Sequence, residues 1–309
     1  MPEKYSIGVD LGGTNLRVAL VSKKGEILER IKISSTGDVL KNLTDSIKSI
    51  MTPEVSGIGL AVAGVIDKEN GLIKHSPNLP SLEGIGIVAE IERETGLKAA
   101  LGNDASMAAL GESISGAGQN VESFVLLTLG TGIGGGIIYK RSLLDIASEV
   151  GHITVESNGR RCFCGGTGCL EAYASSRAMM AFLSEGISEG RETAMKKELQ
   201  NIKPKDIYCY AKSGDAFARE ILKRAGRYLG IGIGNFINLF SPGAVILSGG
   251  LTGAWDIYVA EAIEAASTRA FRELYDKTRI IPSGLGGDAG LVGAAALPHM
   301  CYTTYCREG

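Results

Sequence analysis

Apolar and polar positions along the chain follow two periods. Short β-type runs occupy residues 5–11, 16–22, 56–64, 98–102, 122–130, 135–141, 244–250 and 278–284. Between them, residues 38–50, 84–96, 104–113 and 215–229 have helical spacing, and the last stretch places Phe217, Ile221, Leu222, Ala225 and Leu229 on one face. This alternation predicts an α/β protein with open sheets.

The chain contains an internal repeat. The segment VDLGGTNLRVAL (9–20) aligns with LTLGTGIGGGII (127–138) at an offset of 118 residues, so that strand, glycine turn and strand superpose. Two halves that each begin with such a hairpin would place two backbone loops across a cleft, where their N–H groups can bind a polyphosphate. The glycine-bearing stretch at Gly116–Gly118 predicts the domains 1–116 and 117–309, and the last helix can pack back on the first domain.

Composition and charge narrow the class of partner. The chain has 309 residues, of which 44% are apolar, and this is enough for one large or two medium cores. A formal net charge of −2 without long runs of like charge argues against binding to nucleic acid or to an anionic membrane, so a small-molecule partner is expected. Neither a signal peptide nor a membrane span is visible, and we expect a cytoplasmic protein.

Three glycine turns follow apolar strands. Asp10 ends a strand beside Gly12, Gly13 and Thr14, where a carboxylate can hold Mg²⁺ while the turn contacts phosphate oxygens, although an ordinary hairpin turn explains the loop equally well. The second turn, GTGIGG, satisfies the pattern GxGxxG, but a β run follows it, so the Rossmann context fails. The third, LSGG at 247–250, can leave room for a flat adenine or simply join a strand to a helix.

Asn103 and Asp104 lie where a β run gives way to a helix. One interpretation makes Asp104 the N-cap of that helix, which would account for an aspartate at this position. The other makes Asp104 a general base that takes the proton of a substrate hydroxyl as it attacks the γ-phosphate, with Asn103 bonded to a neighbouring hydroxyl. Position alone leaves both open.

Three cysteines and a histidine form a compact group with the spacing H-x9-C-x-C-x4-C, namely His152, Cys162, Cys164 and Cys169. Three thiolates and one imidazole can close a tetrahedral Zn²⁺ site, and the glycines at 165, 166 and 168 allow tight turns. A disulfide within the group, or coincidence, is the alternative. Four protein ligands leave no open position, so the metal would be structural.

Two glutamates, Glu149 and Glu171, flank this cysteine-rich segment. A loop that a metal holds in place could present their carboxylates to a hydroxylated ligand. Each alone is also explained as a solvated surface charge.

Taken together, these segments resemble the ROK family (repressors, open reading frames and kinases) of bacterial sugar kinases. The matching pieces run in family order from about residue 7 to 297: DLGGTNLR, AVAGVID, SPNLP, GNDASMAALGE, LGTGIGGGI, EVGH, CFCGGTGCLEAYAS, SPGAVILSGG and DAGLVGAAAL. The resemblance implies an actin-like ATPase fold, with two ribonuclease H-like α/β domains and an inter-domain cleft that holds ATP and a hexose.

The resemblance also implies roles for individual residues. Asp104 would be the catalytic base, and the sugar pocket would include Gly64, Asn78, Asn103, Glu149, His152 and Glu171. The phosphate loops would be Gly12, Gly13 and Thr14 with Thr131 and Gly132, next to Asp10 for Mg²⁺, and Gly249 and Gly250 would lie on the adenosine side. His152 would both ligate the structural Zn²⁺ and reach the sugar.

The sequence departs from the family pattern between GTGIGGGII and EVGH. Family members usually carry a longer glycine-rich segment there, whereas this chain has YKRSLLDIAS (139–148). The departure affects the placement of Glu149 and therefore the choice among sugars.

The expected function is ATP-dependent phosphorylation of a hexose, foremost glucose to glucose 6-phosphate, as in glycolysis, by a homodimer or tetramer. N-acetylmannosamine, N-acetylglucosamine, fructose and allose are alternative substrates. A sugar-responsive repressor of the same family would carry a helix-turn-helix before the first loop, where only about five residues stand. A sugar-binding protein without catalysis is the third alternative.

Overall fold

The chain divides into two compact units by its internal contacts. The computed structural model describes residues 4–76, 79–144 and 146–300. Unit 1 comprises Met1–Asn120 and Gly284–Gly309, and unit 2 comprises Val121–Ser283. The chain therefore passes between the units twice, and the first passage lies a few residues beyond the boundary drawn from the glycine-bearing stretch.

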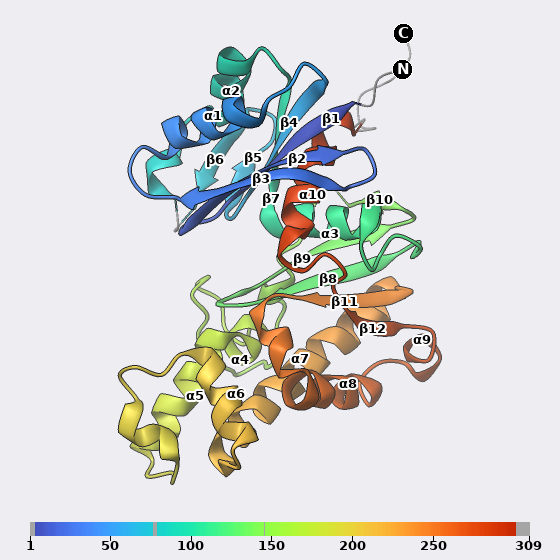
Figure 1. The fold of residues 1–309 in the computed structure, drawn as a ribbon. Coiled ribbons are helices and arrows are strands. Elements are labelled where there is room, and N and C mark those ends of the chain that lie inside the picture. Colours follow the sequence, from blue (N-terminus) through green and yellow to red (C-terminus); the bar gives the residue numbers. More distant parts are fainter. Residues whose placement is uncertain (1–3, 77–78, 145, 301–309) are drawn as a thin grey trace. The chain divides into compact units, whose positions relative to one another are not determined.

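Unit 1 is built on a five-stranded sheet with the order β3-β2-β1-β4-β7 (Figure 1). Its strands are β1 (Tyr5–Leu11), β2 (Asn15–Ser22), β3 (Ile27–Ser34), β4 (Val55–Val62) and β7 (Ala99–Asn103). The first three form an antiparallel meander, and β4 and β7 run parallel to β1. A separate hairpin joins β5 (Val65–Asp67) to β6 (Leu72–His75), followed by a 3₁₀ turn at Pro80–Leu82.

One face of this sheet packs against two amphipathic helices, α1 (Val39–Ile50) and α2 (Ile87–Thr95). Alternate residues of β1, namely Ile7, Val9 and Leu11, are fully buried beneath them, as the period of two predicts. The helix α1 begins where the sequence places it, because the carboxylate of Asp38 accepts a hydrogen bond from the backbone N–H of Lys41 at 3.1 Å.

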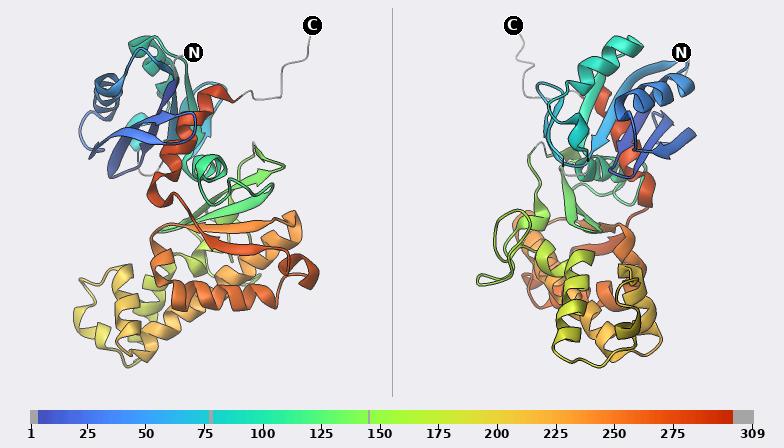
Figure 2. Two further views of the ribbon diagram at one scale, coloured as in Figure 1. Left: turned by 45° about the vertical axis from the view of Figure 1, so that its right-hand side comes forward. Right: turned by 90° about the vertical axis from the view of Figure 1, so that its left-hand side faces the viewer.

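The opposite face carries small residues so that a helix can approach closely. A Cβ on Gly8 would lie 2.0 Å from the carbonyl oxygen of Leu291, and one on Gly59 would lie 1.7 Å from that of Ala294. Both carbonyls belong to α10 (Ala289–Ala296), which also packs against α3 (Asp104–Ser115) (Figure 2). The last helix is therefore part of unit 1, and the 3₁₀ turn Leu297–His299 continues it.

A buried carboxylate lies where the chain leaves unit 1 and returns to it. Glu112 of α3 is fully buried. It accepts hydrogen bonds from the backbone N–H groups of Ala117 at 2.6 Å, Gly284 at 3.0 Å and Leu285 at 2.9 Å. One side chain therefore holds both passages of the chain.

Unit 2 has a five-stranded sheet with the order β10-β9-β8-β11-β12. Its strands are β8 (Phe124–Leu129), β9 (Ile133–Tyr139), β10 (Ser142–Leu143), β11 (Ala244–Ser248) and β12 (Arg279–Pro282). Strands β8, β9 and β10 form an antiparallel meander, and β11 and β12 run parallel to β8.

The helices of unit 2 form one core with the face of its sheet that carries Val125, Leu127, Val245 and Leu247. They are α4 (Glu171–Ala174), α5 (Ser176–Ser188), α6 (Pro204–Lys212), α7 (Ala216–Phe240), α8 (Ala260–Ser267) and α9 (Arg272–Tyr275). Shorter turns lie at Val150–His152, Ala194–Glu198, Gly250–Ala254, Trp255–Val259 and, in unit 1, Gly286–Asp288. None of the helices in the described ranges combines the length and apolarity that crossing a membrane requires.

The helix α7 extends beyond the predicted end at residue 229. Its second half contains Gly230, Gly232 and Gly234, which lower helix propensity. These glycines are sites of close packing, since a Cβ on Gly230 would lie 2.5 Å from the carbonyl oxygen of Ala262 in α8. Tertiary packing therefore overrides local propensity here.

The two sheets have the same strand order and the same directions, as the internal repeat predicts. Their first hairpins differ by one residue. Leu11 pairs with Leu16 in unit 1, whereas Leu129 pairs with Ile133 in unit 2. The first strands are related by an offset of 118 residues, but the second strands by 117.

Candidate functional site

The predicted site residues of unit 1 gather at one edge of its sheet. Strands β1, β4 and β7 are parallel, so their carboxyl ends meet at the same edge. In open α/β sheets, ligands bind at this edge. The residues located there are Asp10 near the end of β1 with Gly12, Gly13 and Thr14 after it, Gly64 after β4, and Asn103 at the end of β7 with Asp104 after it.

Asn103, not Asp104, caps α3. The side-chain oxygen of Asn103 accepts hydrogen bonds from the backbone N–H groups of Ala105 at 3.1 Å and Ser106 at 3.2 Å. Asp104 is the first residue of the helix, half-buried, and its Oδ1 accepts from the N–H of Ala105 at 2.9 Å. The interpretation of Asp104 as the N-cap is therefore wrong.

Gly64 lies next to Asn103. The amide nitrogen of Asn103 donates to the carbonyl oxygen of Gly64 at 3.4 Å. The φ angle of Gly64 is 133°, and a Cβ there would lie 2.4 Å from the carbonyl oxygen of His75, so only glycine fits. The fourth residue predicted in this part, Asn78, lies outside the described residues.

Asp10 forms an ion pair with Arg17, its cross-strand neighbour on β2. Arg17 also donates to the carbonyl oxygen of Gly287 at 2.7 Å. Only Oδ2 of Asp10 is engaged in this pair. The donor set still fits Mg²⁺, because this ion commonly uses one or two protein carboxylates, several waters and the phosphates of its substrate.

Each glycine loop holds backbone donors ready for an anion. The N–H of Gly12 donates to Asn15 at 3.1 Å, and that of Gly130 donates to Gly132 at 3.0 Å, so each loop closes on itself. Within the described ranges, no acceptor contacts the four N–H groups at the loop tips, those of Gly13, Thr14, Thr131 and Gly132. Unpaired N–H groups on a tight turn can bind phosphate oxygens.

The corresponding edge of unit 2 holds the second and third glycine turns. Strands β8 and β11 are parallel and end at Leu129 and Ser248. Gly249 follows with a φ angle of 93°, and a Cβ there would lie 2.4 Å from the carbonyl oxygen of Leu129. Gly249 therefore brings the third turn against the second, and Gly250 begins the turn Gly250–Ala254.

The side chain of Glu171 stabilises the second glycine loop through a hydrogen bond. Its Oε2 accepts a hydrogen bond from the backbone N–H of Ile133 at 2.9 Å, and a Cβ on Gly132 would lie 2.4 Å from the same oxygen. The N–H of Ser176 donates to the carbonyl oxygen of Gly130 at 2.9 Å. Glu171 is therefore not a solvated surface charge, because it ties the loop to α4.

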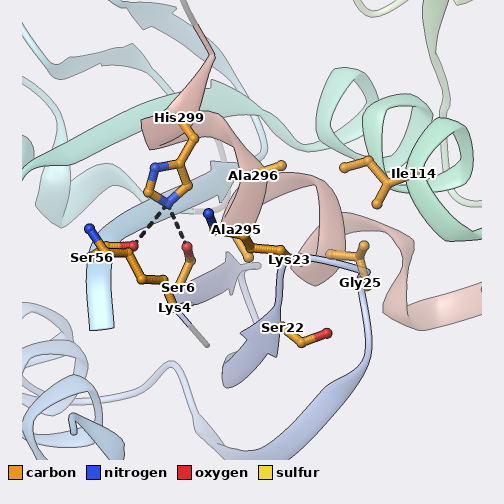
Figure 3. Close-up of a pocket in the computed structure, with 11 residues that line it drawn as sticks. Lys4, Ser6, Ser22, Lys23, Gly25, Ser56, Ile114, Ala295, Ala296 and His299 are labelled. Atoms are coloured by element: carbon orange, nitrogen blue, oxygen red, sulfur yellow. Dashed lines mark hydrogen bonds between the residues drawn. The ribbon is translucent and has the colours of Figure 1, made fainter. Parts of the chain in front are cut away.

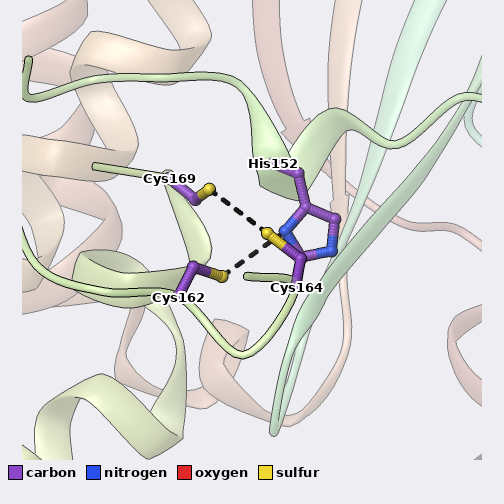
Figure 4. A group of neighbouring side chains, drawn as sticks. All are labelled: His152, Cys162, Cys164 and Cys169. Atoms are coloured by element: carbon purple, nitrogen blue, oxygen red, sulfur yellow. Dashed lines mark hydrogen bonds between the residues drawn. The ribbon is translucent and has the colours of Figure 1, made fainter. Parts of the chain in front are cut away.

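The four predicted metal ligands converge. His152, Cys162, Cys164 and Cys169 place their donor atoms within 4.8 Å of one another (Figure 4). The separations between Cys162 Sγ and His152 Nδ1 and between Cys164 Sγ and Cys169 Sγ are both 3.6 Å. A tetrahedral Zn²⁺ with Zn–S of about 2.3 Å and Zn–N of about 2.0–2.1 Å has ligand-to-ligand edges of about 3.6–3.8 Å. The group therefore fits a tetrahedral metal ion.

The thiols of this group differ in their surroundings. All three cysteines are free, which excludes the disulfide alternative for this group. Burial, together with hydrogen bonds that its thiol donates to the neighbouring cysteines, raises the pKa of Cys169 to about 12, and burial also raises the pKa of Cys162. A hydrogen bond from the backbone N–H of Gly166 lowers the pKa of Cys164. A bound cation would have to displace the protons of Cys162 and Cys169.

His152 links this group to Glu149. Its Nδ1 faces Cys162, while its Nε2 lies 3.9 Å from Oε2 of Glu149. The side chain of Glu149 is 63% exposed. The structure therefore brings Glu149 and His152 together, with Glu149 open to solvent.

Two residues of unit 1 went unnoticed in the sequence. Arg17 carries a signal that could have found it, because a hairpin with a four-residue loop places it opposite Asp10. Glu112 has no comparable signal, since its partners Gly284 and Leu285 lie far along the chain.

Two sheets of identical strand order, each with a glycine turn between its first two strands, define the actin-like ATPase fold. The model of the ROK family matches residues 6–300. The chain therefore belongs to the ROK family.

Relatives within the family include both enzymes and regulators. A glucokinase of Thermotoga maritima is 36% identical over 96% of this chain and 98% of its own length. The crystal structure of a ROK family glucokinase from Streptomyces griseus, in complex with glucose and AMPPNP, has a TM-score of 0.79 and 30% identity over 95% of this chain and 98% of that one. A ROK family transcriptional regulator, homologous to the E. coli MLC protein, has a TM-score of 0.86 and 28% identity over 96% of this chain and 78% of that one.

Proposed function

We propose that the chain is an ATP-dependent sugar kinase, with glucose as the first candidate substrate. The observation that carries this proposal is the position of Asp104 at the carboxyl edge of the sheet, where Asn103 has taken over the capping of α3. The similarity to the glucokinases of Thermotoga maritima and Streptomyces griseus supports the same assignment.

In the proposed reaction, Asp104 accepts the proton of a sugar hydroxyl while that oxygen attacks the γ-phosphorus of ATP. The bond between the γ-phosphorus and the bridging oxygen breaks, and ADP leaves with the electron pair. Such transfers depend on positioning and charge neutralisation. The tip N–H groups of the two glycine loops would bind phosphate oxygens, and Asp10 would hold Mg²⁺, which neutralises charge on the phosphates.

Six residues are proposed to recognise the sugar, namely Gly64, Asn78, Asn103, Glu149, His152 and Glu171. Because Oε2 of Glu171 already accepts from Ile133, its Oε1 is the oxygen proposed to meet a sugar hydroxyl. Gly249 and Gly250 would lie along the adenosine.

We further propose that the group formed by His152 and the three cysteines holds a structural Zn²⁺. Four protein ligands saturate a tetrahedral ion, so its contribution would be to fix the segment that carries Glu149 and Glu171. Elemental analysis of the purified protein should find about one zinc per chain. A fully active protein without zinc would exclude this role.

The test of the kinase proposal is a coupled assay of ADP release with ATP and Mg²⁺. The sugars are glucose, fructose, mannose, allose, N-acetylglucosamine and N-acetylmannosamine. We expect turnover with glucose, and a decrease in kcat of about 10²–10⁴-fold in Asp104→Asn, because the amide cannot accept the proton. Calorimetry should show that this variant still binds the sugar.

The matched control is Asp45→Asn, which removes the same charge from an exposed position of α1 in the same unit. It should keep the activity of the unchanged protein. Strong residual turnover in Asp104→Asn would exclude Asp104 as the base. Turnover with only one of the other sugars would support the assignment as a kinase and would replace glucose by that sugar as the substrate.

A second candidate is a sugar-responsive protein without phosphoryl transfer. The similarity to the ROK family transcriptional regulator favours it, although this chain covers 78% of that one. Saturable sugar binding with no ADP release from any of the six sugars would identify this function.

A further inference from the structure

A cavity lies in unit 1, at the edge of the sheet opposite to the candidate site. It has a volume of about 540 Å³, within the range of small-molecule sites. Ser6 and Ser56 line it near the amino ends of β1 and β4, and Ser22 lines it at the carboxyl end of the antiparallel strand β2 (Figure 3). The residues at the other ends of β1 and β4 belong to the candidate site, so the two places are distinct.

The lining of this cavity is cationic and polar. Lys4 and Lys23 contribute ammonium groups, and His299 contributes an imidazole. The chain contains 34 aspartates and glutamates, yet none of the lining residues within the described part of the chain is acidic. Among the described residues, neither lysine forms an ion pair with a carboxylate. Two adjacent cations without an anionic partner favour an anion between them.

His299 forms hydrogen bonds with hydroxyl groups that line the cavity. Its Nε2 lies 2.7 Å from Oγ of Ser6 and 3.4 Å from Oγ of Ser56. The hydroxyl of Ser56 donates to the carbonyl oxygen of Tyr5 at 3.0 Å. If His299 is neutral at Nε2, the proton of Ser6 points to the ring. If Nε2 carries a proton, it donates to Ser6, and the hydroxyl of Ser6 can turn to a ligand.

The protonation state of His299 responds to its surroundings. Burial, and then the positive charges of Lys23 and Lys4, lower the pKa of His299. The other groups that face the ring are the serines of β1 and β4. The residues that α10 and α3 contribute to the cavity are apolar, namely Val292, Ala295, Ala296 and Ile114, and β7 carries no titratable side chain. An anion would cancel the two positive charges and allow the ring to take up a proton.

We propose that this cavity binds the phosphate group of a small molecule, and that binding is coupled to protonation of His299. Lys4 and Lys23 would neutralise the anion, and the hydroxyls of Ser6 and Ser22 would donate to its oxygens. Oγ of Ser22 already accepts from the N–H groups of Lys24 at 3.3 Å and Glu26 at 3.2 Å, so its own proton is the group to donate. The apolar residues of α10 would pack against the organic part.

The test uses NMR titration of the histidine ring signals. The chain has only three histidines, His75, His152 and His299. The signal of His299 is assigned by its loss in His299→Gln. Sulfate is the probe for the pH series, because its charge stays constant near neutrality. We expect sulfate to raise the pKa of His299 and to leave the ring signals of His75 unchanged at each pH, since His75 is paired with Glu83 on another part of the unit.

Linkage sets the size of the effect on affinity. A ligand that binds together with one proton should gain up to about tenfold in affinity for each pH unit, between the pKa values of His299 in the bound and the free protein. Affinity should therefore rise as the pH falls. His299→Gln should remove this pH dependence.

Neighbouring lysines provide a matched pair of variants. Lys23→Gln should abolish the effect of sulfate on His299, whereas Lys24→Gln, with the same charge change one residue along but outside the lining, should keep it. Both variants should keep the basal activity. An unchanged His299 in the unaltered protein, or an equal response in both variants, would overturn the proposal.

A final comparison separates an organic phosphate from an inorganic ion. Glycerol 3-phosphate should bind more tightly than sulfate at one fixed pH, because its carbon chain can contact α10. Equal affinities would restrict the site to an inorganic anion and overturn the small-molecule part of the proposal.

Discussion

Units 1 and 2 carry the same sheet, strand for strand, but different side chains at the edge where the parallel strands have their carboxyl ends. In unit 1 the first loop follows Asp10, which is paired with Arg17. At the equivalent positions of unit 2 stand Thr128 and Gly134, and Glu171 reaches the loop from outside the sheet. The shared sheet fixes where backbone donors lie, whereas the charges near them come from the first two strands in unit 1 and from a segment outside the sheet in unit 2.

The second difference concerns how each unit is completed. Unit 1 buries the small-residue face of its sheet against α10, which comes from the far end of the chain. Unit 2 is formed by one continuous stretch of the chain, and its segment from His152 to Cys169 contains the four candidate metal ligands. Unit 1 is therefore completed by a distant helix, whereas the candidate metal ligands of unit 2 lie close together in the sequence.

Removal of the metal should have the largest effect, and only in unit 2. Structural Zn²⁺ in zinc-finger peptides contributes an apparent ~10–16 kcal/mol at pH 7, so a chelator should unfold the segment from His152 to Cys169. Because the ligands must be deprotonated, metal affinity should fall as the pH falls. Hydrogen exchange followed by mass spectrometry, with zinc analysis across pH, checks both points. An equal loss of protection from exchange in unit 1 would contradict the prediction that the metal stabilises only unit 2.

Gly59→Ala should have the next largest effect, and only in unit 1. The added methyl group would lie 1.7 Å from the carbonyl oxygen of Ala294, so α10 must shift, and we expect a loss of about 3 kcal/mol in the free energy of unfolding. Gly253→Ala in unit 2 is the control, because nothing lies within 4 Å of its Cβ. Denaturant unfolding measures the free energy of unfolding of both variants. Similar losses in the two would show that close packing on α10 does not distinguish unit 1 from unit 2.

Glu112→Gln should cost about 1–3 kcal/mol, since it weakens hydrogen bonds from buried N–H groups to a charged acceptor. We expect faster hydrogen exchange at Ala117, Gly284 and Leu285 together, because they share this acceptor. The control is Glu122→Gln at an exposed position. Faster exchange at Ala117 alone, or at Gly284 and Leu285 alone, would show that Glu112 does not hold the two connections between the units together.

The smallest effect concerns the turns after the second strand of each sheet. In unit 2, Lys140 and Arg141 have φ angles of 49° and 65°, a region that favours glycine, whereas the turn in unit 1 has Gly25 at 82°. Arg141→Gly should stabilise unit 2 by about 0.5–1 kcal/mol. Lys24→Gly in unit 1, where φ is not positive, should destabilise by a similar amount. Thermal unfolding curves would reveal the opposite signs.

The sequence predicted the features that depend on local pattern. The duplicated hairpins, the start of α1 at Asp38 and the convergence of His152 with its cysteines are confirmed by the structure. Within the short segment at 139–148, Ser142–Leu143 form β10 in a tight hairpin with β9, and the geometry of the turn could not be read from Lys140 and Arg141. Propensity alone would place glycine or asparagine there.

Features that depend on distant packing were missed. The end of α7 was predicted too early because Gly230 packs closely on α8 and the two following glycines pack on other segments of unit 2. The capping of α3 fell to Asn103 through backbone geometry at the strand end. The contacts of Glu171 and Glu112 also join segments that are remote in sequence. The roles proposed for the sugar and nucleotide residues remain predictions that the assays above address.

The split of unit 1 also sets an order of events during protein synthesis. About 176 residues separate Asn120 from the end of α10 at Ala296. At ~5–20 residues per second, a ribosome would leave the sheet of unit 1 without α10 for about 10–35 s. Unit 2, although second in the sequence, is then the first unit whose residues are all available, and the nascent N-terminal sheet must wait with Gly8 and Gly59 uncovered.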